Sequence, residues 1–520
     1  METGTRGVPV RPPFRGGARS ELEGRVSDVR QAPERAYGRL AFQGTVAIGV
    51  AQFCKVVLQL VSLFALSRIL SPVDFGLVAA VTPIVAFVTL VQDLGLQQTL
   101  VQTRSIGPEQ ISRLFWINIG VASLIALGLV LVAPLLERFY GDPRLPALFR
   151  SWAIPLVASA AASHHIALLN RDLRFRELAF VDISVALITT VMAVLAALAL
   201  RSYWAIWMSV TAGSLMAFSM AATLTGWRPM RPWVGAETRH LLRFGVHVGG
   251  TNIMSFLWAH LDKVIVAKAF GPVQLGLYDL SYKLQLMPSS HVVAPLGRIV
   301  APILGRLKDD ASAYRDTYLT FASAMTWLLT PGILAFGIAA DDLVPLLFGE
   351  KWSSAAPIFA WLTLAGSSQI LFTMGNWLFI SQHRTGEMLG WNAVSSLMAL
   401  VSFLVGLHWG LVGLAASFGL ISLLIRAPLM LLVVGRTGPV AARDLAGLLA
   451  PVVVSAILAF ALVAFLDGAE GMGGLAAIAL SLFSTYGILA LVLVAVPSSR
   501  RRLTRVTARA NALRLRSQDA

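Results

Sequence analysis

The stretch Arg68-Ile-Leu-Ser-Pro-Val-Asp-Phe-Gly-Leu77 recurs in outline 200 residues later as Lys268-Ala-Phe-Gly-Pro-Val-Gln-Leu-Gly-Leu277. In both stretches a cation is followed four residues later by Pro-Val and eight residues later by Gly-Leu. Each stretch lies between two long apolar runs, so we interpret it as the turn of a helical hairpin. An even number of predicted crossings separates the turns, which gives both hairpins the same orientation, as in transporters with parallel repeats. We favour an internal duplication. The alternative is that a short Pro-x-x-x-Gly turn suits any tight hairpin.

The composition indicates a bilayer protein. The 520 residues are 56% hydrophobic and 13% charged, with a mean hydropathy of +0.72. Soluble domains carry about 25% charged residues, so too little polar surface remains here to cover a soluble fold. Cys54 is the single cysteine, which excludes an internal disulfide and a cysteine-cluster metal site. The net charge of +15 gathers at the chain ends and in alternate loops, so we expect no nucleic-acid partner.

Apolar runs long enough to cross a bilayer, about 20 residues, recur along the chain. They predict an all-α membrane protein of about fourteen transmembrane helices, with twelve or thirteen as alternatives. The weakest runs are 275–304 and the hairpin within 387–434. The predicted spans lie near 43–66, 76–100, 113–135, 147–169, 178–200, 204–225, 244–269, 275–304, 317–339, 354–380, 387–407, 410–434, 445–466 and 473–496.

Arginine and lysine are concentrated in every second loop, whereas the intervening loops hold few of them and carry several acidic residues. The loops on the N-terminal side carry Arg104, Arg113, Arg171, Arg174, Arg176, Arg228, Arg231, Arg239, Arg243, Arg306, Lys308, Arg315, Arg384, Arg436 and Arg443. The opposite loops carry Asp142, Asp341, Asp342, Glu350, Asp467 and Glu470. The positive-inside rule therefore places both termini in the cytoplasm.

The spans and the repeat together predict two six-helix lobes with two further helices appended. The predicted units are a disordered basic cytoplasmic tail at 1–40, an N-lobe of helices 1–6 at 41–225, a cytoplasmic linker at 226–243, a C-lobe of helices 7–12 at 244–434, helices 13–14 at 435–497, and a basic cytoplasmic tail at 498–520. No loop is large enough for a fused ATPase or glycosyltransferase domain, and the sequence has no GxxxxGK[ST] phosphate loop. We therefore predict a transporter without its own ATPase and not an enzyme.

The order and spacing of several motifs resemble a known family. The motifs are Leu66–Leu77, Asp93–Gln102, Arg171–Arg176, Leu261–Lys268, Gly276–Lys283 and Leu347–Trp352. They look like the Wzx-like polysaccharide flippases and exporters of the multidrug/oligosaccharidyl-lipid/polysaccharide exporter superfamily. The resemblance covers roughly residues 40–430 and is weak in the last two helices.

This resemblance implies a V-shaped, two-lobed transporter in the bacterial inner membrane. It would move an undecaprenyl-diphosphate-linked oligosaccharide to the periplasmic leaflet by alternating access, for exopolysaccharide, capsule or O-antigen synthesis. The implied partners are the lipid-linked oligosaccharide, a coupling proton or sodium ion, and the polysaccharide polymerase and export machinery. The same superfamily includes drug/cation antiporters and other lipid-precursor flippases, which are the alternatives. We expect a monomer and no cofactor.

A diphosphate cargo needs cations inside the membrane, where ionisable side chains are costly and usually face a cavity. We expect substrate contacts in a central cleft from Lys55, Lys263, Lys283 and Arg298. Snorkelling to a lipid headgroup is the alternative for Arg298. Buried cations outnumber carboxylates, which favours an anionic cargo over the cationic drugs of an antiporter.

Two carboxylates, Asp262 and Asp279, are candidates for a structural ion pair or for coupling to protons or sodium. Asp262 and Lys263 are adjacent and point about 100° apart on a helix, so they are poor partners for each other. We expect Asp262 to meet a cation on another helix, such as Lys283 or Lys55.

Pro288 and Pro295, in the predicted eighth helix, each remove a backbone hydrogen bond and favour a kink. Gly249 and Gly250 give the seventh helix a similar weak point. We assign hinge roles to these four residues, with static kinks as the alternative. No metal site is expected, because the adjacent pair His164-His165 cannot converge on one ion from a helix.

Overall fold

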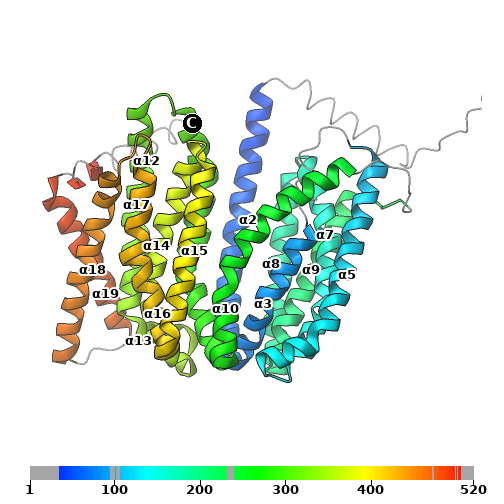
Figure 1. Cartoon of the computed structure of the whole chain (residues 1–520), viewed down its shortest axis with the longest axis horizontal. Helices are drawn as coiled ribbons and strands as arrows, with labels where there is room; N and C mark the ends of the chain where they lie inside the picture. The colour runs from blue at the N-terminus through cyan, green and yellow to red at the C-terminus, as the bar shows by residue number, and fades with distance from the viewer. Residues whose placement is uncertain are drawn as a thin grey trace, which may run out of the picture.

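The computed structural model describes residues 34–93, 100, 106–230, 239–470, 474–497, 499–500 and 502–504, and all secondary structure in these ranges is helical (Figure 1). The first half of the chain forms α2 (Glu34–Ile69), α3 (Pro72–Asp93), α5 (Pro108–Tyr140), α6 (Leu145–Ser151), α7 (Ala153–Arg171), α8 (Phe175–Leu200) and α9 (Trp204–Thr225). The second half forms α10 (Arg239–Pro288), η1 (Ser289–Val293), α11 (Ala294–Arg306), α12 (Ala311–Ile338), α13 (Ala340–Phe348), η2 (Glu350–Ala355), α14 (Ala356–Ser381), α15 (Thr385–Gly406), η3 (Leu407–Trp409), α16 (Gly410–Ile421), η4 (Ser422–Arg426), α17 (Ala427–Gly435), α18 (Ala442–Glu470) and α19 (Leu475–Ala495).

The described residues contain 11 helical segments long and apolar enough to cross a membrane. The prediction of an all-helical, multi-pass membrane protein is therefore confirmed. One of these segments, Thr385–Gly435, has 51 residues. At 1.5 Å per residue it would be about 75 Å long as a single helix, more than twice the hydrocarbon core. It is interrupted by η3 and by Gly410, whose φ is 73°. The count of fourteen stays a prediction.

The longest helical element, α10, consists of two arms. Gly271 has φ 76° and ψ −177°, and Pro272 follows it directly. This backbone conformation is open to glycine but costly for residues with a Cβ, and proline cannot continue the hydrogen bonding of the first arm. The chain therefore reverses at the predicted turn 268–277, and the arms before and after Gly271 face each other.

Among the described residues, one large hydrophobic cluster includes side chains from both halves of the chain. The largest buried cluster joins Leu70, Leu77 and Phe149 of the first half to Leu277 and Trp352 of the second. The other clusters are confined to one half each: one lies within residues 293–503, and two small ones lie within residues 100–224. Figure 1 shows α3 and α10 meeting at its lower edge, opposite the labelled C-terminus, with α13 to their left along the same edge. We call this the closed side.

At the closed side the two predicted turns pack directly against each other. A Cβ on Gly76 would overlap the Pro272 carbonyl, and a Cβ on Gly276 would overlap the Pro72 carbonyl. Gly76 therefore contacts Pro272 in the same way as Gly276, 200 residues later, contacts Pro72. Two equivalent surfaces related by a two-fold axis make such reciprocal contacts. Burial follows the same pattern, since the residues from Phe75 to Ala80 and their counterparts from Leu275 to Leu280 are all buried.

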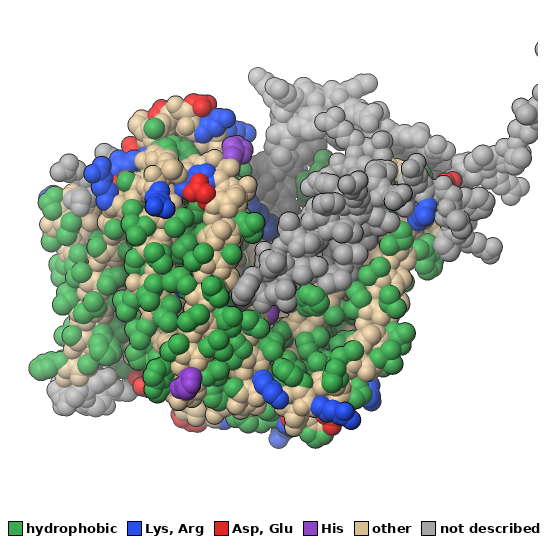
Figure 2. Space-filling model, in the orientation of Figure 1, with side chains coloured by type: hydrophobic (Ala, Val, Ile, Leu, Met, Phe, Trp, Pro, Cys, Tyr) green, Lys and Arg blue, Asp and Glu red, His purple; other side chains and the backbone are tan. Residues whose placement is uncertain are grey.

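The surface matches a bilayer in composition. Figure 2 shows apolar side chains covering the middle of the visible face of α14–α19, whereas charged side chains gather along its upper and lower edges. Exposed leucine, isoleucine, valine and phenylalanine side chains on these helices include Val401, Leu424, Leu432, Phe460 and Phe483. An apolar belt between two charged rims is the distribution that a hydrocarbon core requires.

We predict that Gly76→Ala and Gly276→Ala each lower the free energy of unfolding by about 1–3 kcal/mol, the usual cost of forcing a group into a packed contact. The matched control is Gly120→Ala on α5, where a Cβ meets open space. That change should be neutral or stabilising by up to about 1 kcal/mol, because alanine favours helix. Denaturant titration in mixed micelles measures both. Equal stability of all three variants would contradict the reciprocal contact.

Candidate functional site

The two arms of α10 bring three predicted site residues together. Asp279 is 1% exposed. Its Oδ1 lies 2.6 Å from Lys263 Nζ on the other arm, and its Oδ2 lies 2.6 Å from Lys283 Nζ one helical turn away. The reversal at Gly271 creates the first contact, and the i,i+4 spacing of a helix creates the second. One buried carboxylate thus forms ion pairs with two lysines.

Asp262 has a different partner from the one its sequence suggested. It is 4% exposed, and its Oδ2 accepts a hydrogen bond of 3.0 Å from Tyr278 Oη on the opposite arm. Its Oδ1 is buried without a hydrogen-bond partner among the described residues. The Tyr278 ring stacks on Tyr282 at 5.8 Å, and Lys263 Nζ lies 5.9 Å from the Tyr282 ring centroid. The lysine that we expected beside Asp262, Lys283, pairs instead with Asp279.

Charge balance limits what this α10 cluster binds. With all groups ionised, Lys263, Lys283, Asp262 and Asp279 sum to zero. The side chain of Lys263 is only 8% exposed and is held by Asp279, whereas that of Lys283 is 48% exposed. A cluster whose charges cancel attracts an anion only weakly. An anion-binding group is therefore expected outside these four residues.

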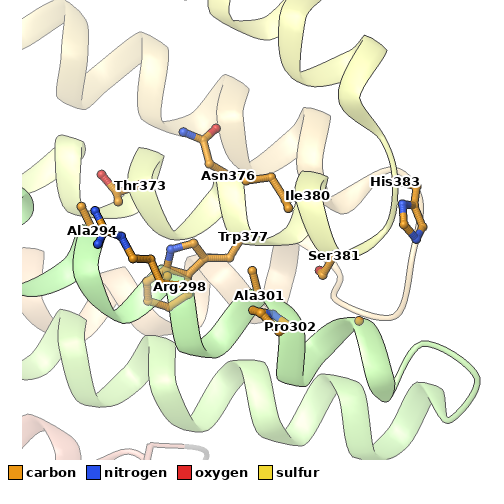
Figure 3. Close-up of a pocket in the computed structure, with 12 residues that line it drawn as sticks. Ala294, Arg298, Ala301, Pro302, Thr373, Asn376, Trp377, Ile380, Ser381 and His383 are labelled. Atoms are coloured by element: carbon orange, nitrogen blue, oxygen red, sulfur yellow. The ribbon is translucent and has the colours of Figure 1, made fainter. Parts of the chain in front are cut away.

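A pocket of about 600 Å³ lies between α11 and the second half of α14. Arg298 lines it from α11, together with the small residues Gly297 and Ala301; Asn376 and Trp377 line it from α14. Figure 3 shows Arg298 and His383 toward opposite ends of this pocket, with Trp377 between them. The Trp377 indole packs on Gly297 so closely that a Cβ there would overlap Nε1. The glycine therefore lets the two helices approach and shapes the pocket wall.

The pocket has an exposed cation and several hydrogen-bonding groups. Arg298 is exposed, and Asn376 Oδ1 is buried without a hydrogen-bond partner in the described part of the chain. Thr373 and Ser381 add hydroxyls near the two ends. A guanidinium suits phosphate, and amide, hydroxyl and aromatic groups suit sugars. Of the predicted substrate contacts, Arg298 lies in the setting that best fits an anionic glycosyl group.

The remaining predicted residues lie elsewhere. Lys55 is an exposed residue of α2. Pro288 ends α10 and is followed by the π-helical turn η1, after which Pro295 occupies the first turn of α11. Gly249 and Gly250 lie within α10, in the stretch 239–259 whose side-chain surroundings are outside the described part. The hinge roles stay predictions.

Arg426, a buried cation on η4, is a candidate functional residue that was not predicted from the sequence. It is 9% exposed, and its guanidinium donates hydrogen bonds to the hydroxyls of Ser395 and Ser422. Its guanidinium carbon lies 5.0 Å from the Phe372 ring centroid and 5.6 Å from that of Phe418. The signal was present, because Arg426 interrupts an apolar run from Gly419 to Val434. Intramembrane arginines are functional candidates by default.

A multi-pass helical fold with a buried arginine, Arg426, in one of its candidate spans, buried charges on α10 and a polar pocket is typical of a transporter-like membrane protein. The sequence profile of the family described as "Polysaccharide biosynthesis protein" matches residues 65–357, more than half of the chain. The chain belongs to this family, which confirms the resemblance to the polysaccharide flippases and exporters.

Three curated relatives show the same relationship. The chain is 23% identical over 377 residues to "Lipopolysaccharide biosynthesis protein WzxC" of Escherichia coli K12, covering 71% of this chain and 75% of the relative. It is 25% identical to "Succinoglycan biosynthesis transport protein ExoT" of Rhizobium meliloti, covering 59% and 62%. It is 22% identical to "Teichuronic acid biosynthesis protein TuaB" of Bacillus subtilis, covering 69% and 75%.

Among solved structures, the fold is similar to "Lipid II flippase MurJ, inward closed conformation". The TM-score is 0.66 at 13% sequence identity, and the match covers 87% of this chain and 98% of that one. At this identity the likeness establishes a shared fold and leaves the substrate to other evidence.

We predict that Asp279→Asn destabilises the protein by about 3–5 kcal/mol, because two ammonium groups lose their shared carboxylate in a buried setting. Lys283→Met should cost at most about 1 kcal/mol, because this lysine is half exposed and the Lys263–Asp279 pair survives. Denaturant titration of both variants in the same micelles tests the difference. Equal losses of stability would show that the cluster is not organised around Asp279.

Proposed function

We propose that this protein moves a lipid-linked oligosaccharide, carried on undecaprenyl diphosphate, from one leaflet of the bacterial inner membrane to the other. Its family membership and its relatives in lipopolysaccharide, succinoglycan and teichuronic acid biosynthesis support a role in polysaccharide production. We infer fourteen crossings with both termini cytoplasmic and alternating access between the lobes 41–225 and 244–434. We propose that the closed side faces away from the cytoplasm.

The observation that carries the proposal is the pocket at Arg298. A lipid diphosphate presents negative oxygens to the cation, and the attached sugar presents hydroxyls and an apolar ring face. Arg298 supplies the cation, and the partly exposed Thr373 and Asn376 line the same pocket with a hydroxyl and an amide. In low dielectric, a guanidinium–phosphate contact is stronger than in water. We therefore assign the diphosphate to Arg298 and the first sugar to Thr373 and Asn376.

We assign different roles to the two buried carboxylates. Asp279 is held between two lysines, so it serves as the structural ion pair of the α10 cluster. Asp262 Oδ1 has no hydrogen-bond partner among the described residues and Asp262 lies beside the cluster, so it is the group that we propose to exchange a proton or bind sodium. Asp279 thus takes the structural role and Asp262 the coupling role, which are the two roles that the sequence leaves open for both carboxylates.

We expect Arg298→Ala to reduce transport about 10- to 100-fold, the loss that follows from removing one charge-assisted hydrogen bond of about 1.5–3 kcal/mol. Arg298→Lys should retain part of the activity, since it keeps the charge and loses the two-pronged geometry. The matched control is Arg306→Ala, which removes an exposed arginine of the same helix outside the pocket.

The assay expresses each variant in a strain whose own gene is deleted and measures surface polysaccharide and the lipid-linked oligosaccharide retained on the cytoplasmic leaflet. Accumulation with Arg298→Ala and normal export with Arg306→Ala support the proposal. Normal polysaccharide in the deletion strain itself, together with new sensitivity to cationic drugs, would refute it and identify a drug/cation antiporter.

Asp262→Asn should abolish acceleration of transport by an ion gradient while leaving substrate affinity within about twofold, because the carboxylate is separate from the pocket. The measurement is flipping of a fluorescent lipid-linked oligosaccharide in proteoliposomes, with a proton gradient, a sodium gradient or neither. Asp142→Asn, outside the spans, is the control. A gradient response retained in Asp262→Asn would exclude Asp262 as the coupling group.

A further inference from the structure

The two copies of the repeated turn each hold a helix end of the opposite half of the chain. Arg68, at the start of the first copy, donates from Nη2 to the Leu346 carbonyl at 2.6 Å and from Nε to the Leu347 carbonyl at 3.4 Å. Lys268, at the start of the second copy, donates from Nζ to the Phe139 carbonyl at 2.5 Å. Its ammonium also lies 5.0 Å from the Phe139 ring centroid.

The two acceptors are themselves equivalent. Phe139 precedes the last residue of α5, and Leu347 precedes the last residue of α13; the helices end at Gly141 and Gly349, both with positive φ. In each case the glycine N–H donates to the carbonyl four residues earlier, which leaves the carbonyls near the helix end open to other donors. A helix C-terminus carries partial negative charge, so both cations lie where the dipole favours them.

These contacts form a pair related by the same pseudo-symmetry as the packing of the turns. Gly76 admits the Pro272 carbonyl, and Gly276 admits the Pro72 carbonyl. Each cation thus lies four residues before a proline whose carbonyl is part of the reciprocal contact. A cation that lay on one turn by chance would form one such contact, whereas the structure has a matching contact from each turn.

We propose that Arg68 and Lys268 are paired gate residues that hold the closed side shut during transport. The hydrogen bonds of both residues must break before this side opens. This inference rests on the proposed function only in requiring that the two halves separate at the closed side. The acceptors are main-chain carbonyls at helix ends, so the gate depends on the shape of α5 and α13 and not on a titrating carboxylate.

The contacts around Arg68 and those around Lys268 differ in strength. On the Arg68 side, Trp352 Nε1 donates to the Ser67 carbonyl at 2.8 Å, Lys351 Nζ donates to the Arg68 carbonyl at 3.0 Å, and the Trp352 ring meets Phe75 edge-on at 5.2 Å. Lys268 has the contact with the Phe139 ring in addition to its hydrogen bond. The contacts of Lys351 and Trp352 use the main chain of Ser67 and Arg68 and survive Arg68→Met, so removing Lys268 should open the gate more than removing Arg68 does.

A cysteine at position 67 reports gate opening. Ser67 is 0% exposed, and Ser→Cys nearly preserves its shape. The background is Cys54→Ser, which removes the single native thiol. The rate of modification by a polar maleimide is measured in nanodiscs for Ser67→Cys alone and combined with Arg68→Met, Lys268→Met or both. Ser353→Cys, on an exposed residue beside Trp352, reports reagent access in every background.

Each single variant should raise the modification rate about 3- to 10-fold and the double variant more, in line with roughly 1 kcal/mol for a charged hydrogen bond at an exposed site. Arg68→Lys with Lys268→Arg keeps both charges and should restore protection, which separates gate opening from misfolding. Rates unchanged in the double variant would overturn the proposal, as would an equal rise at Ser353→Cys. The readout needs no substrate, so it tests the gate independently of the cargo.

Discussion

The close approach of two backbone turns is the constraint on which the rest of the structure depends. Gly76 and Gly276 each lack the Cβ that would strike the proline carbonyl of the other turn. This contact fixes α3 against α10 and positions the largest hydrophobic cluster, which alone joins both halves among the described clusters. Beyond it, each half packs on its own core, so the halves are linked most firmly at the closed side.

The same turn determines the electrostatics of the site. Because Gly271 reverses α10, Asp279 lies opposite Lys263 while the helical repeat places Lys283 beside it. The sequence identifies these residues as intramembrane charges, and it shows that Asp262 and Lys263 diverge. It does not give their partners, because pairing across a hairpin depends on the rotation of each arm. One glycine thus decides which carboxylate is neutralised and which keeps an open oxygen.

Local patterns predict the helices well, and contacts between distant helices less well. The positions of the apolar runs, the repeated turns and the distortion at Pro288 all follow from residue types and spacing. The pocket does not, because it depends on Trp377 of α14 meeting Gly297 of α11, 80 residues away. Arg298 was a candidate from its charge alone, whereas Asn376 and Trp377 gain their significance only from that packing. The partners of Arg426, Ser395 and Ser422, likewise become apparent only from the packing of α15 against η4.

Two π-helical turns contact the same helix, α14, and each turn is close in sequence to a cation. The π-helical turns η1 and η4 both contact α14, and α14 is buried along most of its length. A π turn carries an extra residue in the helical ladder and weakens its hydrogen bonding, so helices bend there more readily than elsewhere. The first turn precedes α11 with Arg298, and the second carries Arg426. Both cations are therefore positioned relative to α14 through a π turn, Arg298 by η1, which leads into α11, and Arg426 within η4.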